Sequence, residues 1–313
     1  MSDVINQIYD LILKSVLDLS PSAVVGLMNG LFDESFPPDS EVIRTATETV
    51  AVTKSGTKKS ESDKMLTIKT GEISRRFHID AEISSNNKEM VIRVFDYGYR
   101  DALLYKTTED GNIVLKFPQP KLIYLEHWST APDTVTLELD FWGQSKAKFT
   151  VPTMKFLDYS VEELDKRNMV ILLPLYLLKL RRKVVAAKEK GSEALKQYVP
   201  ELKALLNDDI LGTIENNVNN GNITHRDAHT LVDLIELLYN HLYGDVQEFQ
   251  DGGVKGMLED KLVLASDFKV LEATEKIAKN FLDKGISPED VADATKLPIE
   301  KVRKLHQQEA YAV

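Results

Sequence analysis

The pattern of apolar and polar positions along the chain predicts an α+β first half and a helical second half. Apolar residues at helical spacing occupy 4–30, with a break at Ser20, which is placed to cap a second helix. After a proline-containing loop the spacing changes to two, which predicts a meander of three strands: 47–53, 65–68 and 77–83. Residues 88–106 return to helical spacing and predict a helix after the third strand.

The pattern beyond this helix predicts one more core strand and a β-hairpin. Residues 121–127 form an apolar run after two prolines, 133–142 alternate strictly, and 146–151 follow as the second arm of the hairpin. From Ser160, which opens a capping-box sequence, only helical patterns follow. The apolar run 169–180 predicts a buried helix, because charged residues flank it and it is too short to span a bilayer.

This order of elements divides the chain into three parts. We predict an α+β domain over 1–158, a helical region over 159–272, and a small end over 273–313 that resembles a helix-turn-helix. For the helices of 205–260 we consider a role in self-association, so a homo-oligomer is left open. The end over 273–313 has two interpretations. Its last helix carries basic side chains that would grip phosphates: Lys301, Arg303, Lys304 and His306. The alternative is a helical unit that packs an apolar stripe, which the neighbouring acids favour.

Composition narrows the class of protein. With 313 residues, 43% of them apolar and 28% charged, the chain has globular proportions. It has no cysteine, which excludes disulfides, thiol nucleophiles and thiolate metal sites and favours a reducing cytoplasm. The N-terminal stretch has no basic segment ahead of its apolar residues, so we expect an amphipathic helix there instead of a signal peptide. The expectation is a cytoplasmic protein without a membrane partner.

The distribution of charge along the chain bears on whether the partner is DNA. A net charge of −10 argues against an indiscriminate coat of nucleic acid, because backbone binding needs Lys and Arg to replace condensed counterions. Two segments are nevertheless basic, 54–76 and 179–190. If they bind DNA, the side chains that would contact phosphates are Lys58, Lys59, Lys64, Arg181, Arg182 and Lys183. The alternative is that both segments are solvated surface.

The candidate chemistry lies in three acids on two predicted strands. Asp63 opens one strand, and Asp80 and Glu82 lie in the middle of the next, with sixteen residues between Asp63 and Asp80. Asp80 and Glu82 are two apart and so share one face of their strand. Carboxylates in a core strand are costly unless they are solvated, paired or bound to a cation. Mg²⁺ takes such oxygen ligands. The alternative is that the acids face solvent beside basic partners: Lys64, Lys69 or Arg93.

Several segments, in order, resemble the bacterial PD-(D/E)xK nuclease-family transposases, also called recombination-promoting nucleases. They are INQIYDLILKSVLDLS, LMNGLFDESFPPDSEV with ATETV, SDKMLTI, FHIDAEISSNNKEMVIRVFDYGY, KLIYLEH and VPTMKFLDYSVEELDKRNMVILLPLYLLKLRR. The resemblance covers about 4–185. It implies a restriction-endonuclease-like core of helix, three-strand meander, helix and strand, to which the hairpin and the helical region are added. It also implies a DNA endonuclease that uses Mg²⁺ or Mn²⁺.

The resemblance also assigns roles to individual residues. Asp63 matches the metal-binding Asp, Asp80 the second acid, Glu82 the Lys or Gln position that follows it, and Glu48 an additional acid on the first strand. Asp80 is one methylene shorter than the usual Glu, and Glu82 puts a negative charge where the family has Lys or Gln. The residues considered for the missing cation are Lys64, Lys88 and Lys121.

The helix after the third strand adds two supporting candidates. Arg93 and Tyr97 could contact a phosphate or orient Asp80, or they could seal the helix against the sheet. Two functional hypotheses therefore stand beside a purely structural one. The first is a metal-dependent DNA endonuclease, and the second is a catalytically weakened nuclease fold that binds DNA or a protein.

Overall fold

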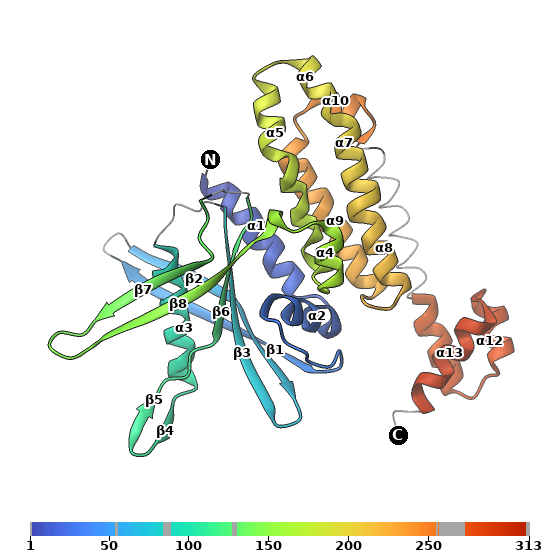
Figure 1. Cartoon of the computed structure of the whole chain (residues 1–313). Helices are drawn as coiled ribbons and strands as arrows, with labels where there is room; N and C mark the ends of the chain where they lie inside the picture. The colour runs from blue at the N-terminus through green and yellow to red at the C-terminus, as the bar shows by residue number, and fades with distance from the viewer. Residues whose placement is uncertain are drawn as a thin grey trace.

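The computed structural model describes residues 2–53, 56–83, 89–126, 130–254, 256 and 273–310; for 2–7, 45–53, 56–64, 304 and 306–310 it describes the backbone only. A six-stranded mixed sheet forms the first half of the chain, and helices make up the rest (Figure 1). This confirms the predicted division into an α+β first half and a helical second half.

The sheet begins with an antiparallel meander of three strands: β1 (Glu41–Thr53), β2 (Gly56–Thr70) and β3 (Ile73–Glu82). Helix α3 (Met90–Leu104) then crosses over the sheet to β6 (Gln119–Tyr124), which runs parallel to β3. The hairpin of β7 (Thr134–Asp140) and β8 (Lys146–Lys155) completes the order β1-β2-β3-β6-β8-β7, with β8 parallel to β6. The predicted sequence of meander, helix, strand and hairpin is found.

A short hairpin between α3 and β6 is not predicted by the sequence pattern. It consists of β4 (Thr107–Glu109) and β5 (Asn112–Val114), which pair only with each other. Each strand has three residues, too few for an alternation of apolar and polar positions to stand out. Figure 1 shows that this hairpin and the β7–β8 hairpin project from the sheet in different directions.

Two helices at the start of the chain cover one face of the sheet. They are α1 (Ser2–Leu17) and α2 (Pro21–Phe32), and Ser20 caps α2 as predicted, accepting a hydrogen bond from the Ala23 amide. Their buried side chains pack with Phe77 and Ile79 of β3 in the larger core. Helix α3 covers the other face, where Val94 packs with Leu122 in a smaller core.

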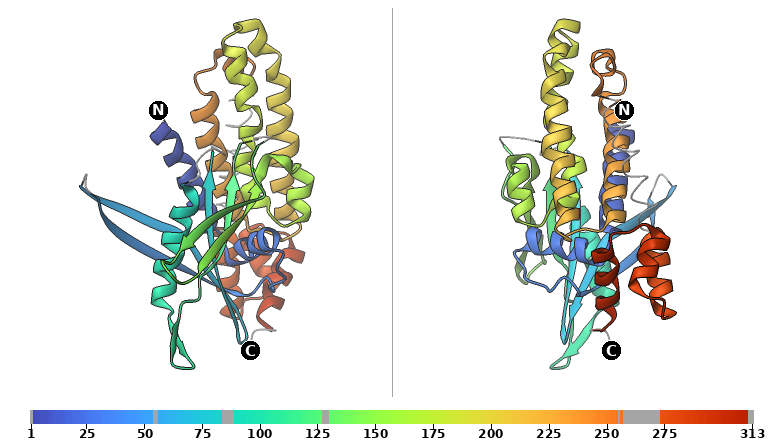
Figure 2. Two further views of the ribbon diagram at one scale, coloured as in Figure 1. Left: turned by 60° about the vertical axis from the view of Figure 1, so that its left-hand side comes forward. Right: turned by 90° about the vertical axis from the view of Figure 1, so that its right-hand side faces the viewer.

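The helical region follows β8, and Ser160 caps its first α-helix with the predicted capping box, in which Glu163 is the partner. Its elements are η1 (Phe156–Asp158), α4 (Val161–Lys166), η2 (Val170–Leu177), α5 (Leu178–Lys188), α6 (Ser192–Lys196), α7 (Tyr198–Ala204), η3 (Leu205–Leu211), α8 (Gly212–Asn219), α9 (His225–Tyr243) and α10 (Gln247–Asp251). The long helices stand side by side and extend away from the sheet (Figure 2).

The apolar run 169–180 is buried, as predicted, but most of it is a 3₁₀-helix. Pro174 lies in the middle of η2 and has no amide hydrogen to donate, so α-helical pairing begins only with α5. Among the described residues no single helix is long and apolar enough to cross a membrane; by length and composition, only the pair Ile8–Leu17 and Pro21–Phe32 passes such a test together, with a bend of 111° between them.

The last described part of the chain is a unit of three helices over 273–283, α12 (Pro288–Thr295) and α13 (Ile299–Ala310). Its core contains Val291 and Val302. Basic side chains considered for phosphate contact are paired within the unit, Arg303 with Glu289 and Lys301 with Glu275. The packed apolar stripe is thus present; the side chains of Lys304 and His306 lie outside the described residues.

Candidate functional site

Asp80 lies within β3 on the face that α3 covers, and its residue is only 2% exposed. Its register partner on β6 is Leu122, a member of the core beneath α3. Ile79, the residue before it, is buried on the opposite face in the core made with α1 and α2. The alternation of side chains along a strand therefore leaves Asp80 and Glu82 on one face and the apolar residues on the other.

Arg93 of α3 is the described partner of the Asp80 carboxylate. Its Nε and Nη2 atoms both lie 2.9 Å from Oδ2 of Asp80, while Oδ1 accepts a hydrogen bond from the Ala81 amide at 2.9 Å. Burial acts to lower the pKa of Arg93, but the charge of Asp80, the hydrogen bond to it and the charge of Glu82 outweigh burial and raise it. Arg93 therefore holds Asp80 in place, one of the two roles expected for it.

Glu82 ends β3 at the edge where the parallel strands β3, β6 and β8 have their carboxyl ends. It is opposite Tyr124 on β6, which in turn is opposite Lys155 on β8. Burial, and then the charge of Glu82, raises the pKa of Tyr124, so the phenol stays protonated beside the carboxylate. Lys155 hydrogen-bonds Asp133 at 2.7 Å, and that bond raises the pKa of Lys155. The register thus aligns an acid, a phenol and an ammonium group.

The strand next to Asp80 carries a register shift at the predicted metal-binding acid. On β1 and β2, Thr45 pairs with Met65 and Thr47 with Ser62, so Asp63 and Lys64 together oppose one residue of β1. Such bulges are over-represented beside active sites, where they re-aim a side chain. Pairing of β2 with β3 ends at Met65 opposite His78, and two more residues in that register would bring Asp63 opposite Asp80.

The other predicted residues of this part of the sheet lie on the described backbone of β1 and β2. Glu48 on β1 is paired with Glu61 on β2. The side chains of five predicted site residues lie outside the described residues: Glu48, Lys58, Lys59, Asp63 and Lys64. In the part of the chain that the structure describes, no group of three or more His, Asp or Glu side chains could hold a metal ion.

Tyr97 and Lys121, both considered near the acids, have distinct positions. The ring of Tyr97, one turn after Arg93, lies 5.9 Å from the buried ring of His78 in an edge-on arrangement. Lys121 pairs with Ile79, which places it on the face opposite Asp80, and its ammonium group lies 5.5 Å above the ring of Phe32. Lys121 is thus away from the acids, while Lys88 lies outside the described residues.

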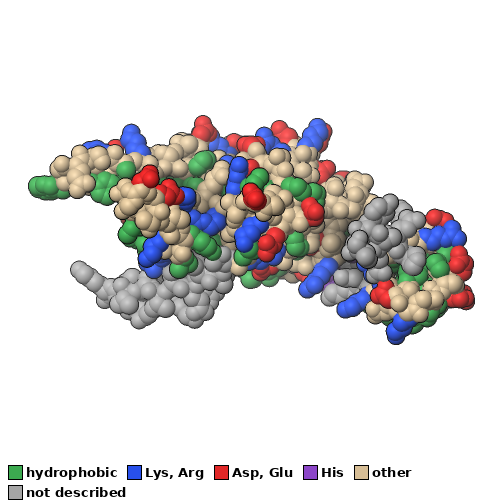
Figure 3. Space-filling model, turned by 90° about the horizontal axis from the view of Figure 1, so that it is seen from below, with side chains coloured by type: hydrophobic (Ala, Val, Ile, Leu, Met, Phe, Trp, Pro, Cys, Tyr) green, Lys and Arg blue, Asp and Glu red, His purple; other side chains and the backbone are tan. Residues whose placement is uncertain are grey.

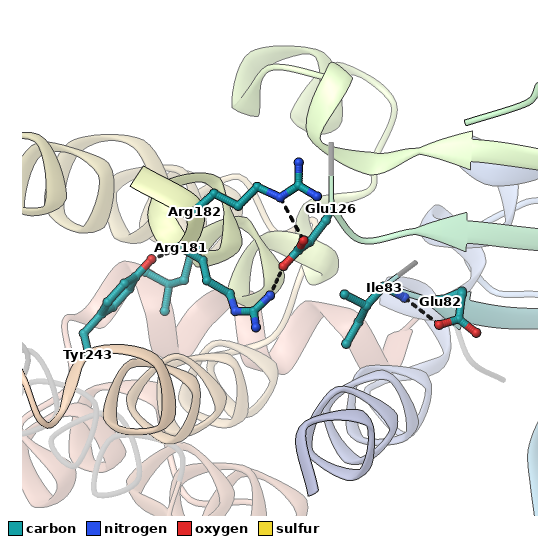
Figure 4. A network of polar contacts seen from close by, with 7 residues as sticks. Glu82, Ile83, Glu126, Arg181, Arg182 and Tyr243 are labelled. Atoms are coloured by element: carbon teal, nitrogen blue, oxygen red, sulfur yellow. Dashed lines mark hydrogen bonds and ion pairs between the residues drawn. The ribbon is translucent and has the colours of Figure 1, made fainter. Parts of the chain in front are cut away.

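The predicted phosphate contacts on α5 hold acids of the same chain. Arg181 and Arg182 both donate to Glu126, which is 5% exposed and lies just past the end of β6 (Figure 4). Lys183 pairs with Glu201 at 2.7 Å. Sequence reasoning missed Glu126, although an acid directly after a buried strand was a signal for it. In Figure 4, Glu82 lies on the neighbouring strand, and its carboxylate points away from the pair of arginines.

A separate cavity of about 180 Å³ lies between α2, the start of η2 and the end of α8. Two asparagine side chains of its lining are engaged within the protein. The Asn29 side chain bonds both backbone groups of Phe36, and the Asn217 amide donates to Asp165 at 2.6 Å. These contacts join α2 and α8 to their neighbours and give the cavity a structural explanation. The acids at the end of β3 thus remain the candidate site.

No family model, curated protein or solved structure matches this chain. The function must therefore be argued from the geometry of the sheet edge and from the residues that it brings together.

Proposed function

We propose that the chain is a metal-dependent DNA endonuclease with a PD-(D/E)xK core of the restriction-endonuclease type. The observation that carries the proposal is the position of Asp80 and Glu82, side by side on one face at the carboxyl end of β3. That strand closes an antiparallel meander and is followed by a helix and a parallel strand, the order that the family resemblance implies. The register shift at Asp63 on the adjacent strand adds to this support.

The donor set at this edge suits a hard divalent cation. Asp80 and Glu82 share one face of β3 with their Cα atoms about 6–7 Å apart along the strand, and Mg²⁺ is commonly held by one or two carboxylates together with water and substrate phosphates. Asp63 would be the third acid. A bound Mg²⁺ or Mn²⁺ would polarise the scissile phosphate and lower the pKa of the attacking water.

The chain's own residues have separate roles in this proposal. Arg93 fixes the Asp80 carboxylate, and its side chain is 43% exposed, so it can also meet a phosphate oxygen. The Tyr124 phenol keeps its proton beside Glu82 and can donate a hydrogen bond to an anion there. The basic side chains that the sequence predicts for phosphate contact would hold the DNA backbone: Lys58, Lys59, Lys64, Arg181, Arg182 and Lys183.

A specific observation favours a second candidate, a catalytically weakened fold that binds DNA or a protein. The buried carboxylate of Asp80 already has a cation beside it, since Arg93 contacts its Oδ2 atom twice within 2.9 Å. Glu82 also stands where a Lys or Gln would help hold the nucleophilic water. A module of this kind would bind its partner equally well in the presence of a chelator.

Incubation with supercoiled plasmid separates the two candidates. Wild-type protein in Mg²⁺ or Mn²⁺ should nick the plasmid, while EDTA and the variants Asp63→Asn and Asp80→Asn should abolish nicking. Asp96→Asn is the matched control, because Asp96 is an exposed acid of α3 paired with Arg100. Nicking that persists in Asp63→Asn and Asp80→Asn would point to a contaminating nuclease, and loss of nicking in Asp96→Asn as well would point to a general effect on the fold. If folded wild-type protein does not nick the plasmid in either metal, the second candidate, a binding module without nuclease activity, is favoured.

A further inference from the structure

The β7–β8 hairpin ends in two large aromatic side chains that no other described part of the chain covers. Trp142 is 97% exposed and Phe141 is 48% exposed. Tryptophan is normally among the highly buried residues, so a hydrated indole at a chain reversal calls for an explanation. Figure 3 shows hydrophobic side chains at the end of the molecule toward which this hairpin points in Figure 1.

The tip is an ordered turn. The strands pair without a register shift from Thr134 opposite Pro152 to Asp140 opposite Lys146. Two backbone hydrogen bonds then close the turn, from the Phe141 amide to Ser145 and from the Gln144 amide to Phe141. Gly143 has a φ of 70°, which a glycine adopts without strain. The hairpin therefore holds the backbone that carries both rings in one conformation.

An aromatic cluster fixes the hairpin to α3. Phe149 of β8 lies 5.3 Å from Phe95 of α3 and 5.7 Å from Phe117, measured between ring centroids. Phe95 and Phe117 lie 5.4 Å apart. These contacts fix the direction of the hairpin relative to α3, so the tip and the end of α3 belong to one rigid unit.

A second apolar surface lies at the end of α3 and on the β4–β5 hairpin. We call it the α3-end patch, and its members are Leu103 (40% exposed), Leu104 (65%), Tyr105 (44%) and Ile113 (73%). In the view from below, hydrophobic side chains are visible around the protrusion next to the hairpin end (Figure 3). The chain thus carries a projecting aromatic tip and a broader apolar patch on one rigid unit.

The exposed areas match what an interface requires. At about 150–250 Å² for a fully exposed aromatic side chain, the tip carries roughly 220–360 Å². The α3-end patch carries roughly 330–550 Å² if the same area is used for each of its four side chains. If two copies bury both surfaces, the total is roughly 1,100–1,800 Å², within the size range of specific protein interfaces. Contiguous apolar surface of this kind marks an interaction site.

We propose that the tip of one copy packs on the α3-end patch of a second copy, and the reverse. A two-fold axis between the copies makes each contact twice and closes the assembly. Charge gives DNA or an anionic membrane no advantage over a protein as the partner, because Lys146, the basic side chain directly behind the tip, is already paired with Glu138 and Asp140. Lys106 borders the patch and makes no ion pair within the described residues, so it can meet Asp140 of the partner copy.

Complementation between variants tests this arrangement. The full-length wild-type protein should sediment as a dimer at micromolar concentration. A tip variant, Trp142→Ser with Phe141→Ser, and a patch variant, Leu104→Ser with Ile113→Ser, should each raise the dimer dissociation constant by about a hundredfold or more. A mixture of the two variants should dimerise more tightly than either variant alone and less tightly than wild type, because one of its two contacts joins an intact tip to an intact patch. Val185→Ser, which removes a 52% exposed side chain from α5, should leave the dimer unchanged.

Three results would overturn the inference. The first is a wild-type monomer at up to about 100 μM, where even a weak homodimer would be populated. The second is a wild-type dimer that the tip variant leaves intact. The third is a mixture of variants that stays monomeric. If the wild-type protein is instead a monomer, and Trp142→Ser lowers its affinity for duplex DNA or for anionic vesicles, then the tip binds that partner. The outcome does not depend on nuclease activity, so the proposed function stands or falls separately.

Discussion

Replacement of Arg93 by methionine should destabilise the protein, because it removes the guanidinium beside a buried carboxylate. The Asp80 side chain is 3% exposed, and Arg93 contacts its Oδ2 atom through Nε and Nη2. Methionine keeps much of the length and the apolar stem of the side chain and lacks the charge. The variant therefore isolates the electrostatic contribution of the pair from the packing of α3 on the sheet.

The expected loss follows from the burial of the two partners. Removing one partner of a fully buried ion pair costs about 3–5 kcal/mol. The Arg93 side chain is 43% exposed, so water screens the pair in part and we expect about 2–3 kcal/mol. The matched control is Arg100→Met, also on α3, where Arg100 pairs with Asp96 and both side chains are more than a third exposed. That change should cost only about 0.3–0.5 kcal/mol.

Urea unfolding followed by circular dichroism in EDTA measures these differences. A double-mutant cycle of Arg93→Met with Asp80→Asn should give a coupling energy of at least about 1 kcal/mol. Equal losses for Arg93→Met and Arg100→Met would refute the reasoning. Repeating the experiment in Mg²⁺ links stability to function, because a ligand at a hundred times its dissociation constant adds about 2.7 kcal/mol. If the proposed metal site is real, Mg²⁺ should restore more stability to Arg93→Met than it adds to wild type.

Two further predictions concern groups outside the site. Asp227 is 2% exposed, and its carboxylate accepts hydrogen bonds from the backbone amides and hydroxyls of Ser20 and Thr224, which links α2 to α9. Asp227→Ala should therefore lower the free energy of unfolding in urea by about 3–4 kcal/mol. A loss below about 1 kcal/mol would contradict this linkage. Burial raises the pKa of Tyr9 from 10.0 to about 12, so the unfolded state loses its proton first and stability should fall by about 1.4 kcal/mol per pH unit between those values. Since the Tyr9 hydroxyl has no hydrogen-bond partner among the described residues, Tyr9→Phe should remove that share of the pH dependence without loss at neutral pH.

Local features of the fold were predictable from the sequence because they depend on neighbouring residues. Ser20 and Ser160 cap helices through amides three positions away, and both caps are present. Strand alternation likewise placed Asp80 and Glu82 on one face without knowledge of their neighbours. Residues 170–177 form a 3₁₀-helix, whereas the sequence predicted a helix without specifying its type. In a buried apolar run every position is apolar, so the pattern has no period that distinguishes an α-helix from a 3₁₀-helix.

Partners distant in sequence were not predictable. From the sequence, Arg181 and Arg182 were predicted to contact phosphates, yet both bind Glu126, which lies 55 and 56 positions earlier in the chain. From the sequence, Lys121 was considered as a cation close to the acids. Only the parallel register of β6 with β3 shows that it lies on the face of the sheet opposite Asp80. The exposure of Trp142 is equally invisible to a pattern, because an aromatic residue that ends an alternating strand is normally expected to be buried.

The two functional candidates place different requirements on the pairing of Asp80 with Arg93. As a binding module the protein needs nothing more, since the buried carboxylate is already compensated. As an endonuclease it needs Oδ2 of Asp80 for a metal ion, and the guanidinium that lies there must then find another anion. A DNA phosphate at this edge would be that anion, so metal and DNA should each increase the affinity for the other by the same factor. In Arg93→Met this coupling should vanish, which metal titrations with and without a short duplex would measure.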